Sequence, residues 1–295
     1  MGPFRNNAPG CAVSSLNLEP SAWQAHLALG FEEDCGTTRM IECRHSGPLR
    51  VQKPLYPEGA RICHAVVLHP PGGVVGGDQL TLTARVGAQA HAVLTTPGAA
   101  KWYRANGKVS QQNLHFELAE GAILEWLPQE SILFDSADVA LNQTVNLAKA
   151  ATFIGTEICC FGRAAKGETF DSGKLAQRIE LRREGQLIWW EQGSLAGGSA
   201  AMHSPLGLAG HSVCATLLAA GTALPAAVLE AIRHEVAALI DGRGEFGISQ
   251  RKSLLVARFL GTSSEIARHV MLCIWQHIRV PLTGRPAMVP RIWNT

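Results

Sequence analysis

The densest group of candidate chemical residues is the loop HPPGGVVGGD at 69–78, which holds four glycines and two prolines. Such a loop could bind phosphate, bind a metal or simply turn the chain. A Walker-type loop needs a lysine and a hydroxyl after its last glycine, but Asp78 and Gln79 stand there. A carboxylate would repel phosphate, and the following LTLTARV has a strand pattern, whereas a dinucleotide loop leads into a helix. We therefore expect no GTP or other nucleotide site.

His69 and Asp78 flank this loop, and both residue types bind borderline cations such as nickel or zinc. Two ligands do not make a stable metal centre. The residues therefore leave two interpretations open. One is a transient cation site, and the other is a broad turn whose glycines allow positive φ and close backbone approach.

Three further carboxylates interrupt apolar segments: Glu125 in ILEWL, Glu157 in FIGTEICCFG and Glu191 after LIWW. An acid in an apolar strand either faces solvent or is buried and must be compensated. For any single one of the three, solvent exposure is the favoured interpretation. Several of them inside a polar passage would instead form a negatively lined route for a cation.

His269, Cys273 and His277 are spaced i, i+4 and i+8 in a predicted helix, which places three potential metal ligands on one face. This stripe runs beside the apolar face, so side-chain packing is the favoured interpretation. Cys159 and Cys160 are a poor chelating pair, because adjacent strand residues point to opposite faces.

The composition excludes several classes of protein. A net charge of +2 without a Lys/Arg cluster argues against nucleic-acid binding. The sequence contains no run of 18 uncharged apolar residues, so we expect no membrane span, and the N-terminus lacks a signal-peptide core. The eight cysteines have no repeated CxxC spacing, which predicts reduced thiols in the cytoplasm. Only 17% of residues are charged, which indicates either an apolar surface covered by a partner or a well-buried core.

From about residue 23 to residue 216, short apolar or alternating segments separated by Gly and Pro predict β-strands. Three of them follow a pair of small residues, at Gly87-Ala88, Gly121-Ala122 and Ala150-Ala151, spaced 34 and 29 residues apart. A loose period near thirty is typical of stacked β-solenoid coils, although a sandwich of regular hairpins could also produce it.

Near residue 222 the pattern changes. Residues 225–241 carry one apolar helical stripe behind Pro225, and residues 248–260 predict a strand pair. A capping box from Thr262 to Glu265 begins a second amphipathic helix, and the chain from Pro281 onward should be extended. We therefore predict a mainly β, helically stacked, β-solenoid-like fold with two α-helices near the C-terminal end. Residues 1–20 are expected to be a flexible tail, and residues 21–295 a single domain.

Several long and unusual segments resemble one known family. They are GPLRVQKPLYPEG (47–59), CHAVVLHPPGGVVGGDQL (63–80), TTPGAAKWYR (95–104), LEWLPQESILF (124–134), CFGRAAKGETF (160–170) and the ending VPRIWNT. Together they resemble the urease accessory protein UreD family, also called UreH. The resemblance runs from about Trp23 to Thr295 and is least distinctive between residues 197 and 221.

The resemblance implies a non-enzymatic chaperone with a helically stacked β-fold and two helices. Its expected partners are the urease apoprotein (UreA, UreB and UreC), UreF and the GTPase UreG. It implies no permanently bound cofactor but nickel in transit, with Asp78, Glu157 and Glu191 as stations of a passage that also contains His69. Two alternatives remain: a metal-dependent hydrolase on a β-solenoid, with His69 and Asp78 as ligands, or a docking scaffold without nickel contact.

Overall fold

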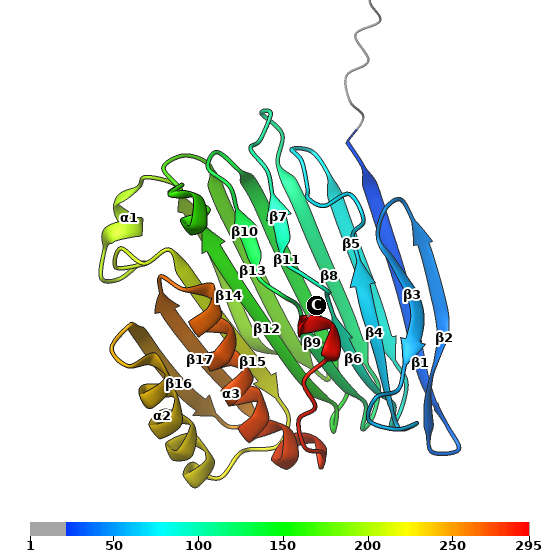
Figure 1. The fold of residues 1–295 in the computed structure, drawn as a ribbon. Helices are drawn as coiled ribbons and strands as arrows, with labels where there is room; N and C mark the ends of the chain where they lie inside the picture. The colour runs from blue at the N-terminus through cyan, green and yellow to red at the C-terminus, as the bar shows by residue number, and fades with distance from the viewer. Residues whose placement is uncertain (1–21, 295) are drawn as a thin grey trace, which may run out of the picture.

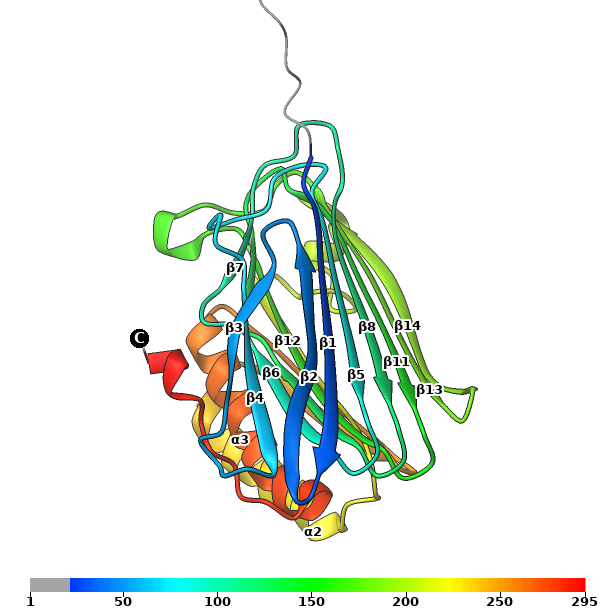
Figure 2. The ribbon, with the colours of Figure 1, turned by 90° about the vertical axis from the view of Figure 1, so that its right-hand side faces the viewer.

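A computed structural model describes residues 22–294 as two facing β-sheets with helices over the outer face of one sheet (Figures 1 and 2). The expected tail at 1–20 lies outside the described residues. Sheet A contains, in sheet order, β14 (Gln186–Ala196), β13 (Lys174–Arg183), β11 (Asp138–Leu147), β8 (Ser110–Leu118), β5 (Gln79–Val86), β1 (Gln24–Asp34) and β2 (Thr37–Ser46).

Sheet B lies against the helices and includes two short strands off its main path, β7 (Ala100–Trp102) and β10 (Ser131–Leu133). Its main path contains, in order, β16 (Gly244–Arg251), β17 (Leu254–Gly261), β15 (Val213–Ala220), β12 (Thr152–Phe161), β9 (Ile123–Leu127), β6 (His91–Thr95), β4 (Ile62–Leu68) and β3 (Arg50–Leu55).

The chain winds between the sheets as a solenoid, from β5 to β6, from β8 to β9 and from β11 to β12. Each of these strands pairs in parallel with its counterpart in the next coil. Leu82 pairs with Leu114, and Leu114 pairs with Gln143, so successive coils are 32 and then 29 residues long. This confirms the predicted stacked fold over the sandwich of hairpins, whose successive strands would pair antiparallel.

The turns from sheet A to sheet B stack Ala90, Ala122 and Ala151, all of which are buried. The amide of Ile123 donates to the carbonyl of Ala90 at 2.9 Å, and the same bond repeats one coil later from Thr152 to Ala122. The predicted pair Gly87-Ala88 is therefore two residues too early. The error has a physical cause: Gln89, with a φ of 60°, occupies the positive-φ position that Gly121, with a φ of 67°, occupies in the next coil.

One apolar core fills the space between the sheets, and a second lies between sheet B and helices α2 (Ala226–Ile240) and α3 (Ser264–Thr283). In β12, Phe153 belongs to the first core and Ile154 to the second, as strand alternation requires. Both predicted helices are thus confirmed. The chain also forms the short helices α1 (Ala200–His203), η1 (Ala164–Lys166) and η2 (Arg291–Asn294).

The ends of α3 differ from the prediction. Its cap is Ser263 rather than Thr262, and the Ser263 side chain accepts a hydrogen bond from the amide of Ile266. The helix also continues through Pro281, where the missing N–H falls in the last turn, and ends at Gly284 with a φ of 71°. Among the described residues, no helix is both long enough and apolar enough to cross a membrane.

Candidate functional site

The side chain of Asp78, the last residue of the 69–78 loop, binds backbone amides inside the loop and next to it. It is buried, its Oδ1 accepts from the amide of Trp23 at 2.8 Å, and its Oδ2 accepts from the amide of Val75 at 3.0 Å. Both carboxylate oxygens therefore hold backbone in place, one at the start of β1 and one within the loop. The loop leads directly into strand β5, as its sequence predicts, and not into a helix.

The loop needs glycine where it passes close to other residues. A Cβ on Gly73 would lie 2.3 Å from the ring of Tyr103, and Gly77 has a φ of 96°. The glycines thus serve the close approach and positive φ expected of a broad turn. This turn also covers one end of the space between the sheets.

His69 follows β4 and faces that space. Its Nε2 is buried and has no hydrogen-bond partner within residues 22–294. Burial lowers the pKa of His69, and the nearby charge of Asp78 opposes this shift. The lowered pKa of His69 favours its neutral imidazole, the form that ligates a metal.

Glu157 points from β12 toward sheet A, where Nε2 of Gln177 donates to its Oε2 at 2.7 Å. Burial, and to a smaller extent the negative charge of Glu191, together raise the pKa of Glu157 to about 7. Gln177 is neutral, and within residues 22–294 no Lys, Arg or His forms an ion pair with Glu157. Such a group favours either a proton or a bound cation.

Glu191 lies on β14, at the edge of sheet A. Its Oε1 forms an ion pair with the guanidinium of Arg258 on β17 at 2.7 Å, whereas its Oε2 is buried without a partner among the described residues. The pair therefore joins the two sheets where β14 faces β17. Arg258 also lines an open groove between these edges, together with Trp189 and Ile248.

A cavity of about 200 Å³ lies between the sheets and under the 69–78 loop, and both His69 and Glu157 line it. Much of its lining is apolar, and its polar members include His69, Lys101, Gln112, Gln143, Thr156 and Glu157. Asp78 and Glu191 are not in that lining, but each lies close enough to act by charge, Asp78 on His69 and Glu191 on Glu157. The four predicted residues thus occupy the two ends of one inter-sheet region.

Glu125 shows that solvent exposure is the wrong interpretation for at least one of the three carboxylates. It is wholly buried on the helix side of sheet B. Its carboxylate accepts from Nε1 of Trp275 at 2.6 Å and from the guanidinium of Arg279 at 3.0–3.1 Å, and it contacts Nε2 of His91 at 2.6 Å. Glu58 binds the same guanidinium and also contacts His64.

We call these six residues, Glu58, His64, His91, Glu125, Trp275 and Arg279, the buried ionic network. Sequence reasoning missed it, because its members come from four strands or loops and one helix. It also missed Gln177, Gln112 and Gln143 in the cavity region and Arg258 beside Glu191. The available signal for the three glutamines was their position on otherwise apolar strand faces.

The cysteine predictions are resolved by burial. Cys159 packs in the core between the sheets and Cys160 in the core beneath the helices, so their side chains do point to opposite faces. The seven cysteines in the described range carry free thiols. In the helical stripe, Cys273 and His277 come together with Glu235, and His269 lies apart, beside Thr262 and Glu265.

Comparison with known proteins assigns the chain to one class, the accessory proteins of an enzyme. A family model described as "UreD urease accessory protein" matches residues 24–294. A protein named "Urease accessory protein UreD" from Janthinobacterium sp. (strain Marseille) is 60% identical over 272 residues, covering 92% of each chain. Its namesake from Nitrosospira multiformis is 53% identical, covering 93% of this chain and 99% of the relative. The chain belongs to the UreD family of urease accessory proteins.

Proposed function

We propose that this protein is a non-enzymatic chaperone of urease maturation that binds the urease apoprotein (UreA, UreB and UreC) and acts with UreF and the GTPase UreG in the cytoplasm. In this proposal the inter-sheet cavity carries nickel in transit toward the urease active site. The relatives are named as accessory proteins rather than enzymes, which supports a role in assisting another protein.

The observation that carries the proposal is that Glu157 lines the cavity without an ion-pair partner among residues 22–294. Its carboxyl has a pKa of about 7 because burial and Glu191 both disfavour its charge. A divalent cation passing through would relieve both effects. His69 offers at the same cavity a ring nitrogen that has no hydrogen-bond partner in the described part of the chain. These are suitable properties for weak, exchangeable binding.

The other two carboxylates have different expected tasks. Asp78 holds the loop in place and adds negative charge beside His69. Glu191 adds negative charge beside Glu157, and its ion pair with Arg258 limits that charge. We therefore assign direct nickel contact to His69 and Glu157, and an electrostatic role to Asp78 and Glu191.

The test is nickel loading of urease at limiting nickel, with the accessory complex assembled from wild-type protein or from Glu157→Gln. We expect the variant to assemble normally and to lower nickel content per urease active site, because the amide removes a charge that lowers the barrier to the cation. Glu117→Gln is the matched control, since Glu117 is exposed on β8.

The two readouts separate the possible roles. Loss of complex together with loss of nickel would indicate a structural role for Glu157. Normal loading in Glu157→Gln, in His69→Gln and in the double variant would contradict the passage and leave a docking scaffold. A nickel ion that the wild-type protein retains through gel filtration and that Glu157→Gln or His69→Gln abolishes would instead favour a resident metal centre in the cavity.

A further inference from the structure

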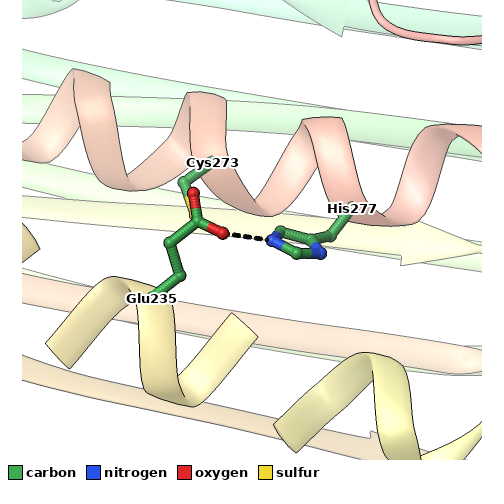
Figure 3. A group of neighbouring side chains, drawn as sticks. All are labelled: Glu235, Cys273 and His277. Carbon is green, nitrogen blue, oxygen red and sulfur yellow. Dashed lines mark hydrogen bonds and ion pairs between the residues drawn. The ribbon is translucent and has the colours of Figure 1, made fainter. Parts of the chain in front are cut away.

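A second group of metal-binding residues lies on the opposite side of sheet B, in the gap between α2 and α3. It consists of Glu235 on α2 and of Cys273 and His277 on α3, and we call it the α2–α3 cluster (Figure 3). One ligand atom from each residue lies within 4.8 Å of the other two. Nε2 of His277 is 2.7 Å from Oε2 of Glu235.

The helices place these side chains together for simple reasons. Cys273 and His277 are one turn apart and share a face of α3. Glu235 precedes the buried Val236, so it stands at the border of the apolar face of α2. Burial is graded across the cluster, because Cys273 is 4% exposed, whereas the side chains of His277 and Glu235 are 28% and 57% exposed. The cluster therefore has an inner sulfur and a mouth open to solvent.

The charges in the cluster differ from those of the buried ionic network. There, the guanidinium of Arg279 lies between two carboxylates. Within residues 22–294, the ion-pair partner of Glu235 is His277, and no Lys or Arg forms an ion pair with the cluster. A Cys273 thiolate and the Glu235 carboxylate together would neutralise the charge of a dication.

The geometry is close to that of a three-ligand metal centre. Tetrahedral zinc binds sulfur at about 2.3 Å and nitrogen or oxygen at about 2.0–2.2 Å, which brings ligand atoms to roughly 3.3–3.8 Å from one another. The 2.7 Å between Nε2 of His277 and Oε2 of Glu235 is shorter than this range, so the exposed Glu235 side chain has to shift as a metal enters. Binding requires the Cys273 thiol to release its proton to solvent as the metal–sulfur bond forms. Water would complete the coordination on the open side.

We propose that Glu235, Cys273 and His277 bind one divalent cation of the zinc, cobalt or nickel class and thereby tie α2 to α3. The mixture of one sulfur, one nitrogen and one oxygen ligand favours these borderline ions over calcium or magnesium. The site is separate from the inter-sheet cavity, and the proposal does not depend on nickel transit through that cavity.

The experiment is a titration of the full-length protein with Co²⁺ in a non-chelating buffer, followed by absorption spectroscopy. We expect one equivalent to produce a sulfur-to-cobalt charge-transfer band and the visible bands of tetrahedral cobalt. Cys273→Ser should abolish the charge-transfer band. Glu235→Gln and His277→Gln should each weaken cobalt binding by at least about tenfold. Added Zn²⁺ should displace the cobalt and raise the melting temperature of the wild-type protein.

Two kinds of control make the result decisive. His234→Gln and His269→Gln change exposed or separate histidines on the same helices, and Cys43→Ser removes an exposed thiol outside the cluster. All three should bind cobalt like the wild-type protein. Because Cys273 is buried and its replacement can disturb packing, Glu235→Gln and His277→Gln test the site on its exposed side. Absence of the band, or a band that survives Cys273→Ser and disappears in Cys43→Ser, overturns the proposal.

Discussion

Glu125 and Glu157 lie on neighbouring strands of sheet B, but the pKa values of their carboxyl groups are shifted in opposite directions. Glu125 faces α3, and the pKa of its carboxyl is lowered, because hydrogen bonds and charge from His91 and Arg279 outweigh the effect of burial. Glu157 faces sheet A, and burial with the charge of Glu191 raises its pKa to about 7. One carboxylate is compensated within the fold, and the other is not.

The difference is consistent with a structural role for Glu125 and with the binding role proposed for Glu157. The buried ionic network connects sheet B to α3 through Glu125 and Arg279, which are 154 positions apart in the chain. Its charges therefore stabilise the contact between these two elements. The charged form of Glu157 instead destabilises the folded protein, and no ion pair within residues 22–294 offsets this cost. A destabilising ionisable group beside a cavity is typical of a binding site.

The largest expected effect is that of Arg279→Met. The substitution leaves Glu58 and Glu125 buried without their shared cation, so we expect the free energy of unfolding to fall by about 3–5 kcal/mol. Urea denaturation measures this loss. Arg233→Met, which removes a solvent-exposed helical ion pair with Glu230, should change stability by less than about 1 kcal/mol. Equal losses in the two variants would contradict the special role of the network.

Glu125→Gln should lower the free energy of unfolding by about 2–4 kcal/mol at pH 7, because it removes the charge that faces Arg279 and His91. Since the pKa of Glu125 is lowered in the folded protein, its contribution is present above the ordinary glutamate pKa of 4.5 and is lost as pH falls. The difference between wild type and variant should therefore shrink in acid. Denaturation curves at pH 7 and at decreasing pH provide the measurement.

Glu157→Gln should have the opposite sign. The folded carboxyl has a pKa of about 7, against an ordinary value of 4.5, so the unfolded chain releases its proton at lower pH than the folded protein does. The cost to folding is absent below pH 4.5, grows between pH 4.5 and 7, and is constant above. The variant should thus be more stable than wild type by up to about 3 kcal/mol at pH 8 and equal to it near pH 4. A loss of stability at pH 8 would show that Glu157 is compensated after all.

The smallest expected effect is that of Glu191→Gln on Glu157. Removing the second negative charge should lower the pKa of Glu157 from about 7 without restoring the ordinary value, because burial is the larger cause of the shift. Carboxyl ¹³C NMR titration of the labelled protein follows this change. Glu42→Gln, at the far edge of sheet A, should leave the titration of Glu157 unaltered. A pKa that does not respond to Glu191→Gln would place the two carboxylates outside effective charge contact.

Much of the architecture could be predicted from the sequence, because strand alternation and helical periodicity depend on residues that are close together in the chain. The alternation of β1, the apolar stripe of α2 and the period near thirty each reflect local geometry. The errors lie where a local rule has an exception. Gln89 adopts a backbone conformation typical of glycine, and α3 continues through Pro281.

The sequence by itself determined the strands, the two main helices and the broad turn at 69–78 that leads into a strand. It also placed Glu125 and Glu157 in apolar strands, but only the tertiary structure decided what each of them faces. Strand alternation tells that two residues lie on opposite faces of a sheet, but it does not tell which layer covers each face. The layer over Glu125 comes from α3, which supplies Arg279. The layer over Glu157 comes from sheet A, which supplies a neutral glutamine and a second carboxylate.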